Sequence, residues 1–225
     1  MSAVPAGAVP APPAPDSREG VIRLLSRRPP LATAAGLAVV VLGTALGLVA
    51  YLLYPWAFSP MGNWLSDLGN VVLSPHGSIF FRADMWVVGA ALVVFFVGLR
   101  AWSRRRGLLL RLLVLLAQAS GIAAAIALLM TGVFPENEFV AHALWATIAF
   151  IALAVTVWFI AWAVVAHPDL PWRASLFAFA VCAVDVVAVA VRWYWLEWLA
   201  VGLLLLFVLL VSGMTHALAA DGHIS

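Results

Sequence analysis

Long apolar stretches separated by short polar segments dominate the pattern along this chain. Six of these stretches hold about 18–27 residues with few charged side chains, and a helix needs about 20 residues to cross a bilayer. Because the bilayer interior offers no water to backbone groups, each stretch is predicted to form an α-helix. The predicted spans are residues 31–56, 78–99, 108–134, 139–165, 174–191 and 193–219. The pattern therefore predicts an all-α, polytopic membrane protein, a bundle of six transmembrane helices.

The composition narrows the class of protein further. The chain has 225 residues, of which 65% are hydrophobic and 10% charged. A soluble domain is about 45–50% apolar and about 25% charged. This composition argues against a soluble enzyme, a nucleic-acid-binding domain, a disordered regulator and a disulfide scaffold. We expect membrane lipids as partners and no nucleic acid.

The segments that flank the spans divide the chain into four parts. Residues 1–15 are rich in alanine and proline and are predicted to form a disordered tail. Residues 16–30 carry four arginines among apolar side chains, which is typical of a basic segment lying on the membrane surface. Residues 31–219 form the predicted six-helix transmembrane domain, and residues 220–225 the predicted cytoplasmic tail.

The distribution of arginine predicts the orientation of the bundle. All twelve basic residues are arginines, and ten of them lie before the first span, around the second loop or in the fourth loop. Only Arg82 and Arg192 fall on the other side. Since basic loops stay in the cytoplasm, both termini are predicted to be cytoplasmic, in a multi-pass protein of the cell (inner) membrane.

Two stripes of small residues predict close helix packing. Gly43 and Gly47 form a GxxxG pattern in the first span, and Ala117, Gly121 and Ala125 line up in the third. Small side chains let neighbouring helix backbones approach one another in a membrane. We therefore expect tight helix contacts at both stripes.

Polar residues inside the predicted spans are the main functional candidates, because such residues are costly in a membrane and usually have a role. Asp84 lies about 9 Å into the second span, and Asp185 about 10 Å from the end of the fifth. His142 lies about one turn into the fourth span. All three are at similar depth in the predicted outer half, so we expect them to face the bundle interior and share a pocket.

The longest predicted outer loop, residues 57–77, adds further candidates. It contains Trp64, Leu65 and Leu68, so it is predicted to fold back onto the bundle as a lid. Ser66 and Asp67 would then cap the pocket. The candidate binding residues around it are Arg82, Arg192, Asn63 and His76.

Two sequence motifs carry a resemblance to a known family. Asn63-Trp64-Leu65-Ser66-Asp67-Leu68-Gly69 resembles the pattern N-x-[IL]-S-D-L-G, and Gly132-Val133-Phe134-Pro135-Glu136 followed by His142 resembles G-x-F-P…H. Together, over about residues 31–219, they resemble the bacterial and archaeal six-helix membrane family called domain of unknown function 998. The resemblance implies a six-span fold and no established activity. It draws attention to Ser66, Asp67, Pro135 and His142.

Three functions remain open at this point. In the first, which we favour slightly, Asp84, His142, Asp185 and Arg192 join helices through interhelical hydrogen bonds. Asp67 would then cap a turn.

In the second, the protein is a membrane-embedded hydrolase or lipid-modifying enzyme. The candidate catalytic residues are His142, Asp67, Asp84, Asp185 and Ser66. A zinc ion on His142, Asp84 and Asp185 would supply a reactive water; without metal, a desolvated carboxyl group would act beside His142, or Ser66 would be the nucleophile.

In the third, the protein binds or helps to transport a lipid, an isoprenoid or another small molecule taken from the outer leaflet. The polar residues are confined to the predicted outer half, which does not favour a continuous path across the membrane.

Overall fold

The computed structural model describes residues 29–104 and 106–224, and within them it contains helices and no strands. Six helices are long and apolar enough to cross a membrane. They are α2 (Leu31–Leu52), α3 (Ser78–Gly98), α4 (Leu108–Val133), α5 (Phe139–Ala166), α6 (Arg173–Val191) and α7 (Tyr194–Ala220); two short 3₁₀ helices are η1 (Leu65–Gly69) and η2 (Leu99–Ser103). The prediction of a six-helix, multi-pass membrane protein is confirmed.

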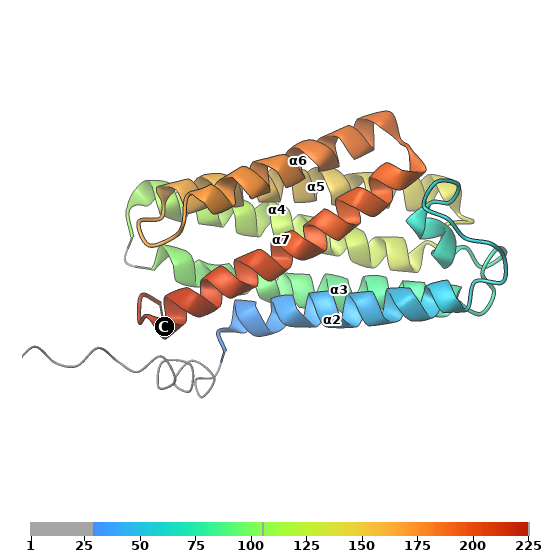
Figure 1. Ribbon diagram of the computed structural model, residues 1–225, viewed down its shortest axis with the longest axis horizontal. Helices are drawn as coiled ribbons and strands as arrows, with labels where there is room; N and C mark the ends of the chain where they lie inside the picture. The colour runs from blue at the N-terminus through green and yellow to red at the C-terminus, as the bar shows by residue number, and fades with distance from the viewer. Residues whose placement is uncertain (1–28, 105, 225) are drawn as a thin grey trace, which may run out of the picture.

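The six long helices form a ring. Each packs mainly against its neighbours along the chain, and α7 closes the ring by packing against α2. Figure 1 shows α7 crossing the bundle diagonally, from α6 at one end toward α2 at the other. We call the end that carries the start of α2 and the end of α7 the terminal end, and the opposite end the η1 end.

Prolines and the residues around them set several helix ends. The predicted first span runs to residue 56, but α2 ends at Leu52, three residues before Pro55. Pro135 likewise follows the end of α4, and Pro168 the end of α5. Proline lacks the backbone N–H that a helix requires and disfavours helical geometry in the residue before it. The apolar pattern therefore located the spans, while proline positions fix where the helices stop.

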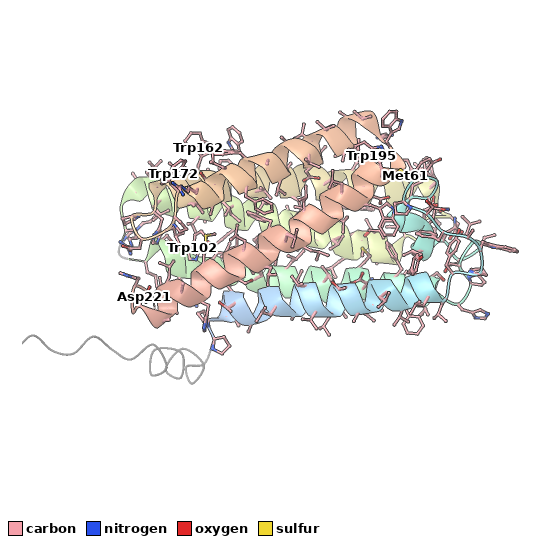
Figure 2. The ribbon with its side chains drawn as sticks, in the orientation of Figure 1. Met61, Trp102, Trp162, Trp172, Trp195 and Asp221 are labelled. Atoms are coloured by element: carbon pink, nitrogen blue, oxygen red, sulfur yellow. The ribbon has the colours of Figure 1, made fainter. Side chains whose placement is uncertain are left out.

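The outer surface of the bundle suits a lipid environment. Large apolar side chains are exposed on every one of the six long helices, among them Leu37, Ile79, Leu108, Val140, Leu176 and Leu199. In Figure 2, Trp102, Trp162 and Trp172 lie toward the terminal end, and Met61 and Trp195 toward the η1 end. Aromatic side chains near both ends are typical of the two membrane–water interfaces.

α2 and α3 pack closely at the terminal end. A Cβ atom on Gly98 would stand 2.6 Å from the Ala32 backbone nitrogen. Nearby, the Thr33 hydroxyl donates a hydrogen bond to the Ser212 carbonyl oxygen at 3.1 Å, which joins α2 to α7. Gly43 confirms the predicted close contact, because a Cβ atom there would lie 3.0 Å from Val88 Cγ2 on α3. Both Gly43 and Gly47 also face the Asp84 carboxylate, which a Cβ atom would meet at 3.4 Å and 3.6 Å. Their missing side chains leave space beside an acidic group.

Only part of the predicted terminal segments falls within the described residues. The predicted tail, residues 1–15, and most of the basic segment, residues 16–30, lie outside the described residues. The predicted tail at 220–225 begins inside α7, which continues to Ala220. The residues that follow fold back: His223 Nδ1 lies 3.6 Å from Asp169 Oδ2, and the side chain of Ile224 is buried. Residues 221–224 therefore pack against the bundle.

Candidate functional site

A cavity of about 520 Å³ lies inside the ring, beneath η1. Residues from α2, α3, α4, α5 and α7 line it, and α6 contributes none. Its volume falls in the range of about 300–1,000 Å³ that is usual for small-molecule sites. The walls are mostly apolar, and the lining residues with ionisable or hydroxyl side chains are Thr44, Tyr51, Ser66, Asp84, Thr131, His142, Thr156 and Glu197.

The polar and apolar ends of this cavity are separate. Asp84, His142 and Glu197 each fall within the first two turns of a helix that begins at the η1 end. Deeper in the bundle the walls consist mainly of apolar side chains such as Leu92 and Leu204, and the hydroxyl of Thr156 there donates to the Ala152 carbonyl oxygen of its own helix. The cavity thus has an acidic end under η1 and an apolar interior.

The cavity opens sideways between α2 and α7. Among its lining residues, Leu48 on α2 is 53% exposed, and Tyr51 on the same helix is also exposed. Across from them, Gly202 on α7 is exposed, and a Cβ atom there would meet nothing within 4 Å. These two helices diverge toward the η1 end (Figure 1). The opening therefore faces the lipid side of the bundle.

Glu197 fastens η1 over the cavity as a lid. The Leu65 backbone N–H donates a hydrogen bond to Glu197 Oε2 at 2.7 Å, and the backbone and hydroxyl of Ser66 also hydrogen-bond to this carboxylate. The Trp198 indole N–H donates to the Asn63 carbonyl oxygen at 3.1 Å. Leu68, which belongs to the lid, is buried against the bundle. The outer loop thus folds back onto the bundle, held by a residue of α7.

Sequence reasoning missed Glu197. The signal was present, because a carboxylate four residues into an apolar helix is the kind of membrane residue that usually has a role. Its position among Trp193, Trp195 and Trp198 directed attention to interface anchoring instead.

Asp67 and Asn63 organise the lid and do not line the cavity. Asp67 Oδ2 accepts hydrogen bonds from Asn63 Nδ2 at 3.3 Å and from the Trp64 backbone N–H at 3.1 Å. Burial raises the pKa of the Asp67 carboxyl; those two hydrogen bonds oppose the shift, and the Glu136 charge adds to it. Glu136 also accepts a hydrogen bond from Asn70, which ties the lid to the α4–α5 connection.

His142 is oriented by the turn that precedes it. Its Nδ1 lies 2.8 Å from the Phe134 carbonyl oxygen. Because a carbonyl oxygen only accepts, Nδ1 carries the proton, and in a neutral ring Nε2 is then an acceptor. Phe134 belongs to the Gly132–Glu136 motif, so this motif has a definite structural role: it fixes the imidazole that lines the cavity.

Of Asp84, His142 and Glu197, Asp84 has the fewest hydrogen-bond partners. It is 7% exposed, and its Oδ1 has no hydrogen-bond partner in the described part of the chain. A Cβ atom on Gly43 would lie 3.4 Å from Oδ1, and one on Gly47 would lie 3.6 Å from Oδ2. The glycine stripe of α2 therefore keeps space open beside this carboxylate.

Several other candidates do not reach the cavity. Asp185 is 0% exposed but lies on α6, away from the lining, and neither of its carboxylate oxygens has a hydrogen-bond partner within the described residues. Arg82 Nε donates to the Gly132 carbonyl oxygen at 2.9 Å, and its guanidinium lies over the Trp86 ring. His76 is exposed on the loop. The structure does not bring Asp185 into the pocket predicted for it with Asp84 and His142.

The predicted zinc site lacks its set of ligands. Across residues 29–104 and 106–224, no group of three or more His, Cys, Asp or Glu side chains is arranged to hold a metal ion. His142 and Asp84 share the cavity, but the third predicted ligand, Asp185, does not line it.

Arg192, another candidate, ends α6. It is exposed, its φ is 54°, and its backbone N–H donates to the Ala188 carbonyl oxygen at 3.0 Å. The left-handed conformation is strained for a residue with a Cβ atom and favours glycine after a helix. The structure thus gives Arg192 a turn-forming position outside the cavity.

Replacing Arg192 with glycine is expected to stabilise the protein by about 1 kcal/mol, because it relieves this strain. Thermal unfolding in detergent measures the effect. Arg192→Ala removes the same charge and keeps the strain, so it is expected to give no such gain. Equal shifts in both variants would show that the charge, and not the backbone, sets the stability here.

A second cavity, of about 490 Å³, lies at the terminal end and has the opposite character. Arg100, Arg104 and His216 line it together with the first residues of α2 and the end of α7. The two ends of the bundle therefore differ in charge: the described cavity at the η1 end has acidic walls, and that at the terminal end has basic ones.

Comparisons with known proteins give no information about the function, which must be argued from the geometry of the cavity. No family model, curated protein or solved structure matches the chain. The resemblance carried by residues 63–69 and 132–142 therefore stays a prediction.

Proposed function

We propose that this protein binds a single-chain amphiphile within the membrane, in the cavity beneath η1. The observation that carries the proposal is the shape of this cavity: acidic at one end, apolar along its depth, and open to the side between α2 and α7. An amphiphile has the same division into a polar head and an apolar chain. Its head would lie near Asp84 and His142, and its chain beside Leu92 and Leu204.

The lateral opening gives such a ligand a direct route from the bilayer. An alkyl chain that passes between Leu48 and Gly202 meets mainly apolar surroundings. Because it exchanges lipid neighbours for apolar side chains, hydrophobic burial contributes little to binding, as it does for helix association in membranes. The fit of the chain and the contacts of the head group therefore decide which ligand binds.

The distribution of charge favours an outer-leaflet ligand. Within the described part of the chain, the terminal end carries Arg100 in η2, Arg104 and Arg106 in the loop that follows, and Arg173 at the start of α6. The positive-inside rule then assigns this end, with both termini, to the cytoplasm of a cell-membrane protein. In that orientation the η1 end, with its lid and polar groups, faces outward, and the head group would come from the outer leaflet.

Binding accounts for the contacts better than the other two hypotheses. A purely packing role would have Asp84 and Asp185 hydrogen-bonded between helices, yet Asp84 Oδ1 and both Asp185 oxygens have no partner in the described structure. The predicted serine nucleophile would use His142 as its base, yet within the described residues no hydrogen bond joins the two side chains, and His142 Nδ1 is engaged by the Phe134 carbonyl oxygen. An open polar end in an apolar cavity fits a bound head group.

Blocking the opening is the direct test. The wild-type protein in phospholipid nanodiscs is exposed to a long-chain alcohol with a photoreactive diazirine near the end of its chain, and labelled peptides are mapped by mass spectrometry. We expect labels in the apolar walls around Leu153 and Leu204. Gly202→Phe, which fills the opening, is expected to reduce this labelling about tenfold, equivalent to about 1.4 kcal/mol of affinity.

Gly213→Phe is the matched control. Gly213 lies on the same helix, outside the cavity, and a Cβ atom there also meets nothing within 4 Å. This variant is expected to keep wild-type labelling. Equal labelling of the cavity walls in both variants, or labels confined to the outer faces of the helices, would refute the proposed route and site.

A further inference from the structure

The walls of the η1-end cavity contain acidic groups and no permanent cation. Its lining includes Asp84 and Glu197 but no arginine, and the sequence contains no lysine. The nearest arginine along the chain, Arg82, donates to α4 instead of lining the cavity. Among the described lining residues, the only side chain that can become positive is His142, by protonation, so a permanent positive charge at this end would have to come from an occupant.

Glu197 and Asp84 differ in how they are satisfied. The Glu197 carboxylate already accepts the Leu65 N–H and the hydrogen bonds of Ser66, so it is used in holding the lid. Asp84 is more than nine-tenths buried, lines the cavity, and has an oxygen with no partner in the described structure. Asp84 is therefore the carboxylate left for a ligand.

The imidazole of His142, which also lines the cavity, favours a hydrogen-bond donor as Asp84 does. Because His142 Nδ1 is engaged by the Phe134 carbonyl oxygen, a neutral imidazole offers only the acceptor Nε2. A carboxylate and an imidazole acceptor both need a hydrogen-bond donor. An ammonium group supplies several donors and a positive charge at once.

The burial of Asp84 strengthens the preference for an ammonium group. A buried carboxylate without a partner is unfavourable, and an oppositely charged, hydrogen-bonding partner relieves that penalty. Gly43 and Gly47 place no side chain beside the carboxylate, and Oδ2, unlike Oδ1, is not enclosed, so a compact head group can approach the carboxylate at Oδ2. A hydroxyl head satisfies one acceptor without the charge, and a carboxylate head would be repelled.

Resting on the proposed function, we infer that the amphiphile carries an amine head group, with Asp84 as its counter-ion and His142 as a second acceptor. The ligand class is thus a single-chain lipid amine. Asp84 selects the head group, and the apolar walls accept the chain.

Three probes with the same diazirine-bearing chain test this inference: an amine, an alcohol and a carboxylic acid. In the wild-type protein we expect the amine to label the cavity walls about tenfold more strongly than the alcohol, because hydrogen bonds to charged groups are stronger than neutral ones. The acid is expected to label least. In Asp84→Asn, which keeps the size of the side chain, the preference for the amine is expected to disappear.

Asp185→Asn is the matched control, because Asp185 is also a buried carboxylate but does not line the cavity. It is expected to keep the amine preference. Equal labelling by the amine and the alcohol in the wild type, or an amine preference that persists in Asp84→Asn, would overturn the inference and leave the proposed function intact. If none of the three probes labels the cavity walls, the proposed function fails as well.

Discussion

Replacing Gly98 with leucine is expected to destabilise the bundle by about 2–3 kcal/mol, the upper part of the range for overpacked positions. The added Cβ atom would stand 2.6 Å from the Ala32 backbone nitrogen and 2.8 Å from the Ala32 Cβ. Since backbone atoms of α2 cannot rotate away as a long side chain can, the two helices would have to separate. Unfolding of the purified protein in detergent, followed by circular dichroism, measures the loss.

Gly213→Leu is the control for Gly98→Leu. It introduces the same side chain on an exposed face of α7, where nothing lies within 4 Å of the new Cβ atom. Leucine is also a better helix former than glycine, so this variant is expected to be at least as stable as the wild type. If both variants unfold alike, close contact between α2 and α3 does not limit the stability of the bundle.

Replacing Glu197 with leucine is expected to release the lid. The Leu65 N–H and the polar groups of Ser66 would lose their acceptor, and each of these partly buried donors left without a partner costs about 1 kcal/mol. We therefore expect amide hydrogen exchange in residues 65–69 to accelerate about tenfold or more, while exchange in the middle of α3 and α5 stays unchanged. Hydrogen exchange with mass spectrometry in nanodiscs measures both regions in one experiment.

Two further variants separate the role of Glu197 from general effects. Glu197→Gln keeps an acceptor oxygen and is expected to retain most of the protection. Glu138→Leu makes the same chemical change at an exposed position at the same end of the bundle, and is expected to leave the lid protected. Unchanged exchange at residues 65–69 in Glu197→Leu would mean that other contacts hold the lid.

The sequence predicted the fold well because the length of each apolar stretch determines whether it can form a helix that crosses the membrane. It did not predict which face of each helix points inward. In a soluble helix, polar residues mark the outer face, but these helices are apolar on nearly all sides because they meet lipid outside and side chains inside. Asp84 and Asp185 therefore looked equivalent, whereas Asp84 lines the cavity and Asp185 does not.

The lid and the glycine stripe of α2 also show that the sequence does not reveal which residues contact one another across the bundle. The apolar residues of the outer loop predicted that it folds back, but the partner that holds it, Glu197, is 132 residues away from Leu65 along the chain. GxxxG predicted a tight helix contact at Gly43 and Gly47, yet small residues also serve where a neighbouring polar group needs room. Local sequence patterns give the positions of small and charged residues. Which of these residues line the cavity and which pack between helices depends on how the six helices pack in the ring.

The ring of helices also determines where its wall can part. Among the described helices, every neighbouring pair is joined by a connecting segment except α2 and α7, the first and last members of the ring. The hydrogen bond from Thr33 to Ser212 fastens this pair at the terminal end. At the η1 end α2 and α7 can therefore move apart without stretching a connecting segment between them. Chain topology, rather than a flexible hinge sequence, makes this junction the part of the helix ring that can separate at least mechanical cost, and the proposed ligand would enter there.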